Sequence, residues 1–180
     1  QEDPNHPVMT AIASAAETKV KGILEHYPNL DVLGVNAYGG ASGAARACKQ
    51  AGWRKPFVLT EFGPRGHWEV AKTAWDAPIE PTGREKAAAY YATLALLAEE
   101  PDIALGSYVF LWGHKQEVTS TWYGMFLSSG EKLPAVDAVC RAWSGKWPDN
   151  RCPKITRFDS PLNQATVAPG RTIRASVTAE

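Results

Sequence analysis

Strand-like and helix-like segments alternate along the first 145 residues of this chain, and this order constrains the fold more than any other feature. Short apolar runs typical of strands lie at residues 8–13, 32–36, 57–61 and 104–112. Helical spacing of apolar residues follows them at residues 15–27, 42–51, 84–100 and 134–143. Repeated strand–helix units favour a parallel sheet covered by helices. Ser14 is the predicted N-cap of the first helix, and residues 123–133 are predicted to form a hairpin.

The number of these units leaves two α/β architectures open. A whole (β/α)8 barrel takes about 250 residues, so the 145 residues of this region suit its second half, strands 5 to 8. The alternative is a small open α/β sheet. No GxGxxG or GxxxxGK[ST] motif follows any strand, so a phosphate-binding α/β fold lacks support. A half barrel leaves two unpaired strand edges, and we expect a missing N-terminal barrel half or another chain to cover them.

The character of the chain changes after the last predicted helix. We expect the barrel half to span residues 1–145, a linker rich in Trp and Pro to span 146–154, and the truncated start of an immunoglobulin-like β-sandwich to span 155–180. The stretch TIRASV alternates after the turn at Pro169 and Gly170, as a strand does. A disordered tail is the alternative for this last segment.

Composition excludes several kinds of partner. The net charge is 0, which argues against a nucleic-acid or anionic-membrane partner, and no apolar run is long enough to span a bilayer. Three cysteines are too few for a disulfide scaffold and too scattered for a zinc site, so we expect no metal and no cofactor. Cys140 and Cys152 are expected either to form a disulfide bond with each other or to be free thiols. His67 and His114 are interpreted as polar residues at the rim of a site, since neither has further metal ligands at useful spacing.

Polar and aromatic residues stand at the ends of successive predicted strands. The second strand ends with Asn36 and Tyr38, the third with Glu61, and the fourth with Trp112 and then His114. In a (β/α)8 barrel these ends meet at the active site. Amides bond sugar hydroxyls, an indole face stacks on a pyranose, and a carboxylate attacks or stabilises an anomeric carbon, so the set suits a sugar. The alternative for Glu61 is an ion pair with the nearby Arg65.

These strand ends carry a resemblance to a known group of enzymes. NAY, LTEFGP and VFLWG, in that order, resemble the C-terminal half of a clan A glycoside hydrolase barrel, and the segment YGMFLSSGEKLPAVDAVCRAW resembles the barrel-closing segment of the β-galactosidase and β-glucuronidase family. The resemblance implies that Glu61 is the nucleophile and Tyr38 the phenol that orients it. It also implies that Trp112 is a platform under the sugar and that Asn36 lines the site. The acid/base Glu of the clan follows an Asn, and no such pair occurs here, so we expect it upstream of Gln1.

The resulting expectation is a retaining glycosidase or transglycosylase acting on a β-linked oligosaccharide or polysaccharide, with a β-glucan as the expected substrate. The alternative is a barrel that binds a glycan without catalysis. An ester or amide hydrolase lacks support, because no G-x-S-x-G motif is present. Loop tryptophans more often face a ligand or a neighbouring loop, and Trp68, Trp75 and Trp122 are expected to bind substrate. The substrate class also predicts a periplasmic or secreted protein.

Overall fold

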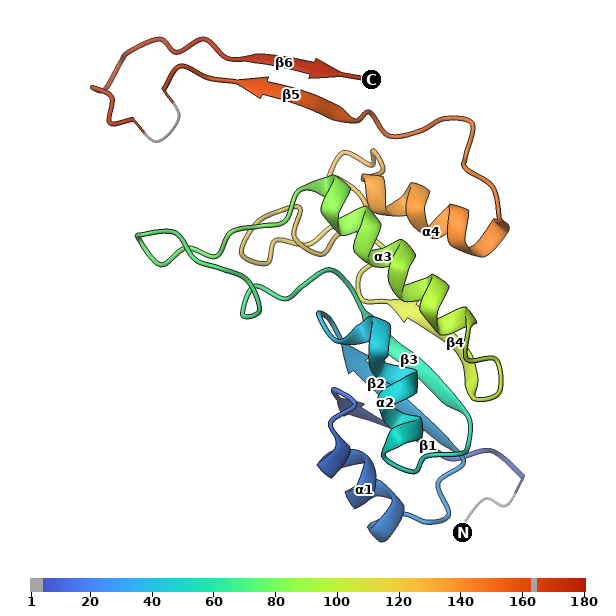
Figure 1. Cartoon of the computed structure of the whole chain (residues 1–180). Helices are drawn as coiled ribbons and strands as arrows, with labels where there is room; N and C mark the ends of the chain where they lie inside the picture. The colour runs from blue at the N-terminus through green and yellow to red at the C-terminus, as the bar shows by residue number, and fades with distance from the viewer. Residues whose placement is uncertain (1–4, 163–164) are drawn as a thin grey trace.

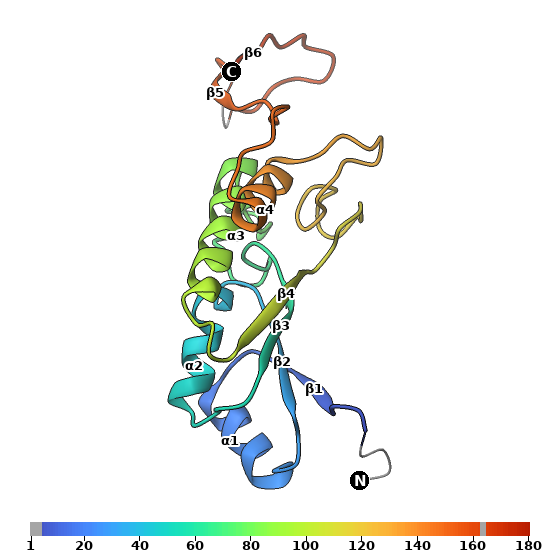
Figure 2. The same ribbon diagram turned by 90° about the vertical axis from the view of Figure 1, so that its right-hand side faces the viewer.

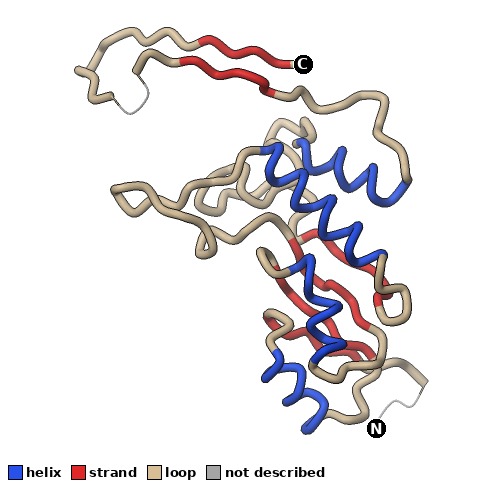
Figure 3. Tube along the Cα trace, in the orientation of Figure 1, coloured by secondary structure: helices blue, strands red, loops and turns tan. Residues whose placement is uncertain are grey.

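The chain forms a four-stranded parallel sheet with helices packed on it, followed by a separate two-stranded sheet (Figures 1 and 3). The computed structural model describes residues 5–162 and 165–180. The strands of the first sheet, adjacent in chain order, are β1 (Met9–Ala13), β2 (Val32–Ala37), β3 (Phe57–Phe62) and β4 (Ala104–Val109). The helices are α1 (Glu17–His26), the 3-10 turn η1 (Ala41–Gly43), α2 (Ala44–Gln50), α3 (Gly83–Ala98) and α4 (Pro134–Ser144). The second sheet pairs β5 (Ile155–Asp159) with β6 (Ser176–Ala179) in antiparallel fashion.

The predicted α/β alternation and the parallel sheet are confirmed. Helices α1, α2 and α3 lie on one face of the sheet (Figure 2). That face is the core, where Leu33, Val35 and Leu59 are 0% exposed. The opposite face has no helix over it, and Met9 and Tyr108 on it are 52% and 67% exposed. Because β1 and β4 are the outer strands, the sheet of the described residues is open and does not close on itself.

Two local predictions were wrong, and a third was confirmed. Ser14 does not cap α1: its backbone N–H donates to Asn36 O at 2.8 Å, which extends the strand ladder, and α1 begins after Ala16 with no side-chain cap. The fourth strand ends at Val109 instead of residue 112, because the ladder to β3 is irregular and ends there. The small hairpin predicted at 123–133 is present: residues 126 and 132 form an antiparallel bridge, and the N–H groups of Leu127 and Leu133 donate to Glu131 O and Met125 O at 2.8 and 2.9 Å.

The last described segment differs from the body in burial. Every residue of β5 and β6 is exposed, so this hairpin has no core of its own. Cys140 and Cys152 are both free thiols, which settles that alternative. None of the helices in the described ranges has the length and apolar character needed to cross a bilayer.

Candidate active site

Glu61 reaches the uncovered face of the sheet through a β-bulge. Leu59 pairs with Val35, but the next pair along the ladder is Glu61 with Asn36, so β3 has one residue more than β2 at this point. Such a bulge re-aims the side chain that follows it. Glu61 therefore shares the face of Asn36, although strict alternation would have directed it toward the helices.

Two uncharged donors hold the Glu61 carboxylate. The Tyr38 hydroxyl donates to Oε1 at 2.5 Å, and Asn36 Nδ2 donates to Oε2 at 3.2 Å. The Thr60 hydroxyl donates to Asn36 Oδ1 at 2.7 Å, so the amide nitrogen of Asn36 is the group left to face Glu61. The predicted hydrogen bond between Tyr38 and Glu61 is confirmed. Within residues 5–162 and 165–180 no ion pair joins Glu61 to Arg65, the alternative partner.

Tyr38 stands inside a cluster of aromatic rings. Its ring meets those of Trp68, Phe110 and Tyr123 edge-on, with centroids 5.3, 5.8 and 5.5 Å away. Burial in this cluster raises the pKa of Tyr38, and the hydrogen bond to the Glu61 carboxylate raises it further. The Tyr38 phenol therefore remains protonated, and able to donate a hydrogen bond, at every pH at which folded proteins normally function.

Trp112 lies beyond the end of β4, at the same end of the sheet as Glu61. Its indole is 56% exposed and packs against the ring of Phe126, with centroids 5.2 Å apart. The aromatic residue of this segment that contacts Tyr38 is Phe110, which sequence reasoning missed. An apolar run that ends in Phe110, Leu111 and Trp112 gives no signal as to which of them turns inward.

The loop residues predicted to bind substrate divide into two groups. Trp68 and Trp75 are 59% and 76% exposed, and His114 is exposed, so these three side chains are accessible. The prediction for Trp122 was wrong, because its indole is 0% exposed and its Nε1 donates to Arg65 O at 3.0 Å. The two long loops after β3 and β4 pack on each other, and Trp122 fills the core between them.

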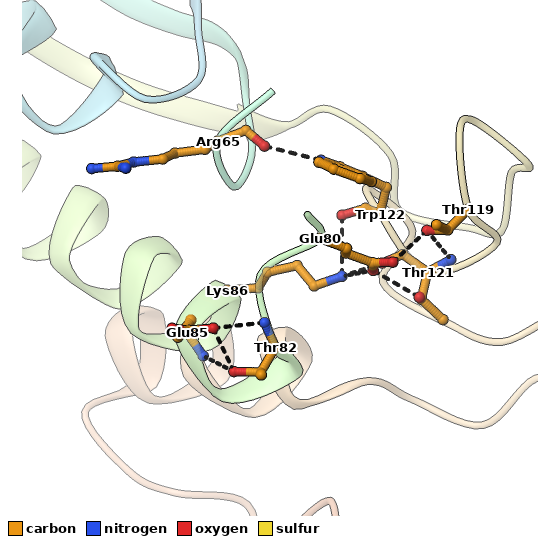
Figure 4. Close-up of polar contacts among 8 residues, drawn as sticks. All are labelled: Arg65, Glu80, Thr82, Glu85, Lys86, Thr119, Thr121 and Trp122. Carbon is orange, nitrogen blue, oxygen red and sulfur yellow. Dashed lines mark hydrogen bonds and ion pairs between the residues drawn. The ribbon is translucent and has the colours of Figure 1, made fainter. Parts of the chain in front are cut away.

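A buried ion pair joins these same two loops to the start of α3 (Figure 4). Glu80 Oε1 accepts from Lys86 Nζ at 2.5 Å, and the hydroxyls of Thr119 and Thr121 donate to Glu80 at 2.6 and 2.8 Å. Burial opposes ionisation of Glu80, but the bonds from Lys86 and the two threonines outweigh it and lower the pKa of Glu80. Sequence reasoning missed this ion pair. Spacing was the missed signal, since Lys86 shares a helical stripe with the buried Tyr90.

Metal ligands are not gathered anywhere in the described part of the chain. No group of three or more His, Cys, Asp or Glu side chains in residues 5–162 and 165–180 is arranged to hold an ion. The polar groups gathered at Glu61 are its own carboxylate, the Tyr38 phenol and the Asn36 amide.

Comparison with solved structures finds glycosidases among the proteins whose fold is similar to this one. No family model matches the sequence, and no curated protein matches it. A Ruminococcus gnavus β-glucuronidase is similar in structure, with a TM-score of 0.53, 18% identity and coverage of 78% of this chain and 26% of that one. An endo-1,4-β-xylanase of Penicillium canescens has a TM-score of 0.55 and 16% identity, over 81% of this chain and 48% of that one.

A GH113 β-1,4-mannanase is similar to the same degree, with a TM-score of 0.54, 17% identity and coverage of 81% and 48%. At these identities the likeness shows the fold alone. The chain spans about a quarter of the glucuronidase and about half of the xylanase and the mannanase. The fold is thus an α/β fold with a parallel sheet whose structural neighbours are glycoside hydrolases, and no one family among them is singled out.

Proposed function

We propose that this chain carries the nucleophile half of a retaining glycosidase or transglycosylase that acts on a β-linked glycan. The observation that carries the proposal is the contact of 2.5 Å between the Tyr38 hydroxyl and Glu61 at the carboxyl end of a parallel strand. The fold likeness to a β-glucuronidase, a xylanase and a mannanase adds to it. Glu61, Tyr38 and Asn36 are the residues proposed to act at the reacting sugar.

In the proposed reaction Glu61 attacks the anomeric carbon. Glu61 Oε1 or Oε2 forms a bond to that carbon, the bond to the leaving oxygen breaks, and the sugar becomes an ester of Glu61. Tyr38 and Asn36 donate hydrogen bonds to the two oxygens of Glu61 and so orient the carboxylate that attacks. A second carboxyl group about 5–5.5 Å away must protonate the leaving oxygen and then activate water or an acceptor sugar. That residue is proposed to lie upstream of Gln1.

The open sheet fits the same proposal. Strands β1 to β4 would be the fifth to eighth strands of a (β/α)8 barrel, and the preceding barrel half, from the same protein or another chain, would cover the edges at β1 and β4. The hairpin of β5 and β6 would begin a β-sandwich module, because two strands alone are marginally stable in water. A periplasmic or secreted location follows from a polymeric substrate.

The exposed indoles are proposed to bind the glycan. Trp112, with His114 at the rim, would support the sugar next to Glu61. Trp68 packs on Tyr38, so it would border the same sugar. Trp75 lies at the tip of a folded hairpin that is closed by the bridge between Lys72 and Pro78, so it would stack on a sugar farther along the chain. A β-glucan oligomer is the substrate we propose to test first.

The proposal is tested by trapping the intermediate in the intact protein, barrel half included. Activated 2-deoxy-2-fluoro-β-glycosides of glucose, galactose, mannose and xylose accumulate the glycosyl ester in a retaining enzyme, and peptide mass spectrometry locates the labelled residue. We expect the label on Glu61. We also expect Glu61→Gln to lower turnover of β-linked oligosaccharides by roughly 10³-fold or more.

Two results separate the proposal from its rivals. A label on another carboxylate, or wild-type turnover in Glu61→Gln, would remove Glu61 as nucleophile. If the wild-type protein hydrolysed no glycan but bound several in calorimetry, the protein would be a glycan-binding barrel instead.

A further inference from the structure

The turn after β2 and the turn after β3 are joined by one carboxylate outside the site described so far. Glu69 Oε2 accepts from the backbone N–H of Gly39 at 2.9 Å and from that of Gly66 at 2.7 Å. The Glu69 N–H donates to Gly66 O at 2.8 Å, which closes the second turn on itself. Two converging amide donors on one oxygen are charge-assisted bonds, stronger and more directional than contacts between flexible surface side chains.

The fit around Glu69 is close on both sides. A Cβ built on Gly39 would lie 3.0 Å from both carboxylate oxygens of Glu69. A Cβ on Gly66 would lie 2.5 Å from the ring of Trp68, so the indole rests on that glycine. A side chain at Gly66 would overlap the indole, and one at Gly39 would require the Glu69 carboxylate to shift by a few tenths of an ångström. The backbone of both turns is therefore brought against Glu69 and Trp68 at van der Waals distance.

These contacts bear on Tyr38 from two directions. The Gly39 N–H belongs to the peptide that directly follows Tyr38, so its bond to Glu69 fixes the backbone torsion from which the phenol projects. Trp68, seated on Gly66, meets the Tyr38 ring at 5.3 Å and 83° and limits its rotation. Held in this way, the Tyr38 hydroxyl lies 2.5 Å from Glu61 Oε1.

We propose that Glu69 is a positioning residue, which pins the turns at Gly39 and Gly66 together and thereby holds the Tyr38 hydroxyl against Glu61. The kinetic part of this inference rests on the proposed function; the structural part does not. Glu69 itself is not assigned a role in bond making or breaking. Its effect passes through Tyr38.

Nuclear magnetic resonance tests the structural part. The intact protein is prepared with 15N-glycine and ring-labelled tyrosine, as wild type, Glu69→Gln, Glu69→Ala and the control Asp76→Asn. Asp76 is an exposed carboxylate of the same loop with a backbone φ of 65°, which Asn tolerates, so the control removes the same charge. We expect the Gly39 and Gly66 amide protons and the Tyr38 ring signals to shift in Glu69→Ala, less in Glu69→Gln, and not in Asp76→Asn. Unchanged Tyr38 signals in Glu69→Ala would overturn the proposal.

A double-mutant cycle tests the kinetic part. Loss of positioning should lower kcat of Glu69→Ala by roughly 10- to 100-fold with KM little changed, and Gln should restore part of it. Tyr38→Phe combined with Glu69→Ala should lose no more than Tyr38→Phe alone, because the second change acts through the hydroxyl that the first removes. Additive losses would overturn the proposal. If the wild type proved inactive on every β-glycoside, the proposed function would fail and the resonance shifts alone would decide the role of Glu69.

Discussion

Glu61 is held by a phenol and an amide, neither of which carries a charge. Tyr38 and Asn36 lie at 2.5 and 3.2 Å from its two oxygens. A cation in either place would form an ion pair with the carboxylate, whereas neutral donors orient it without one, which suits the nucleophile role proposed for Glu61. At the scale of single residues, the site is therefore arranged around one carboxylate and its donors, with indoles at the rim.

Replacing Trp112 by Ala in the intact protein should weaken glycan binding and kcat/KM together, by roughly 2- to 10-fold, because a stacking face serves ground state and transition state alike. Trp143→Ala is the matched control. Its indole, in the last turn of α4, is 59% exposed against 56% for Trp112. Calorimetry and steady-state kinetics on a β-linked oligosaccharide series measure the two effects. Equal behaviour of the two variants would remove Trp112 from the proposed binding site.

At the scale of elements, α3 anchors both long loops of the site. Its N-terminus is closed by a reciprocal capping box between Thr82 and Glu85, which fixes where the first loop ends (Figure 4). One turn later Lys86, 7% exposed, bonds to Glu80 and to the carbonyl of Thr121. The loops that carry the exposed indoles are thus attached to a helix that is itself packed on the sheet and on α4.

The bonds between Glu80 and Lys86 should make the free energy of unfolding depend on pH. The pKa of Glu80 is lowered in the folded protein, so its contribution is fully present above the pKa of the unfolded chain. It is lost as the pH falls through the lower, folded value. Glu80→Gln should therefore flatten the acid side of the plot of unfolding free energy against pH, measured by urea denaturation. Glu25→Gln is the control, because Glu25 is exposed on α1 and its side chain makes no hydrogen bond or ion pair within residues 5–162 and 165–180.

Removing Lys86, the cation of the pair with Glu80, should destabilise the fold more than removing Glu80. Lys86→Met leaves Glu80 partly buried without its cation, and the cost should exceed that of the double variant Glu80→Gln, Lys86→Met. The same denaturation series measures both. A double variant less stable than Lys86→Met would mean that the pair is not the source of the effect.

At the scale of the whole molecule, the sheet has an open face and two open edges. Met9 on β1 and Tyr108 on β4 are more than half exposed there. Unpaired parallel edges with apolar side chains invite association. The proposed barrel would remove both edges by closure.

Residues 1–180 produced as an isolated chain should therefore self-associate, and a form with the preceding barrel half should be monomeric. Light scattering coupled to size exclusion measures the mass of each. Tyr108→Lys in the isolated chain should reduce association, while Tyr91→Lys, which adds the same charge on α3, should not. A stable monomer of residues 1–180 would contradict the half-barrel proposal.

The sequence by itself determined the order of elements and the residues at the strand ends. Period and composition are local properties, so the four strand–helix units, the long helix α3 and the placement of Asn36, Tyr38 and Glu61 near one sheet edge were predictable. Only the tertiary structure decided which loop side chains are covered. Trp122 is buried, Glu80 meets Lys86, and Phe110 instead of Trp112 contacts Tyr38. These outcomes depend on how two long loops pack against each other, and no local periodicity encodes that packing.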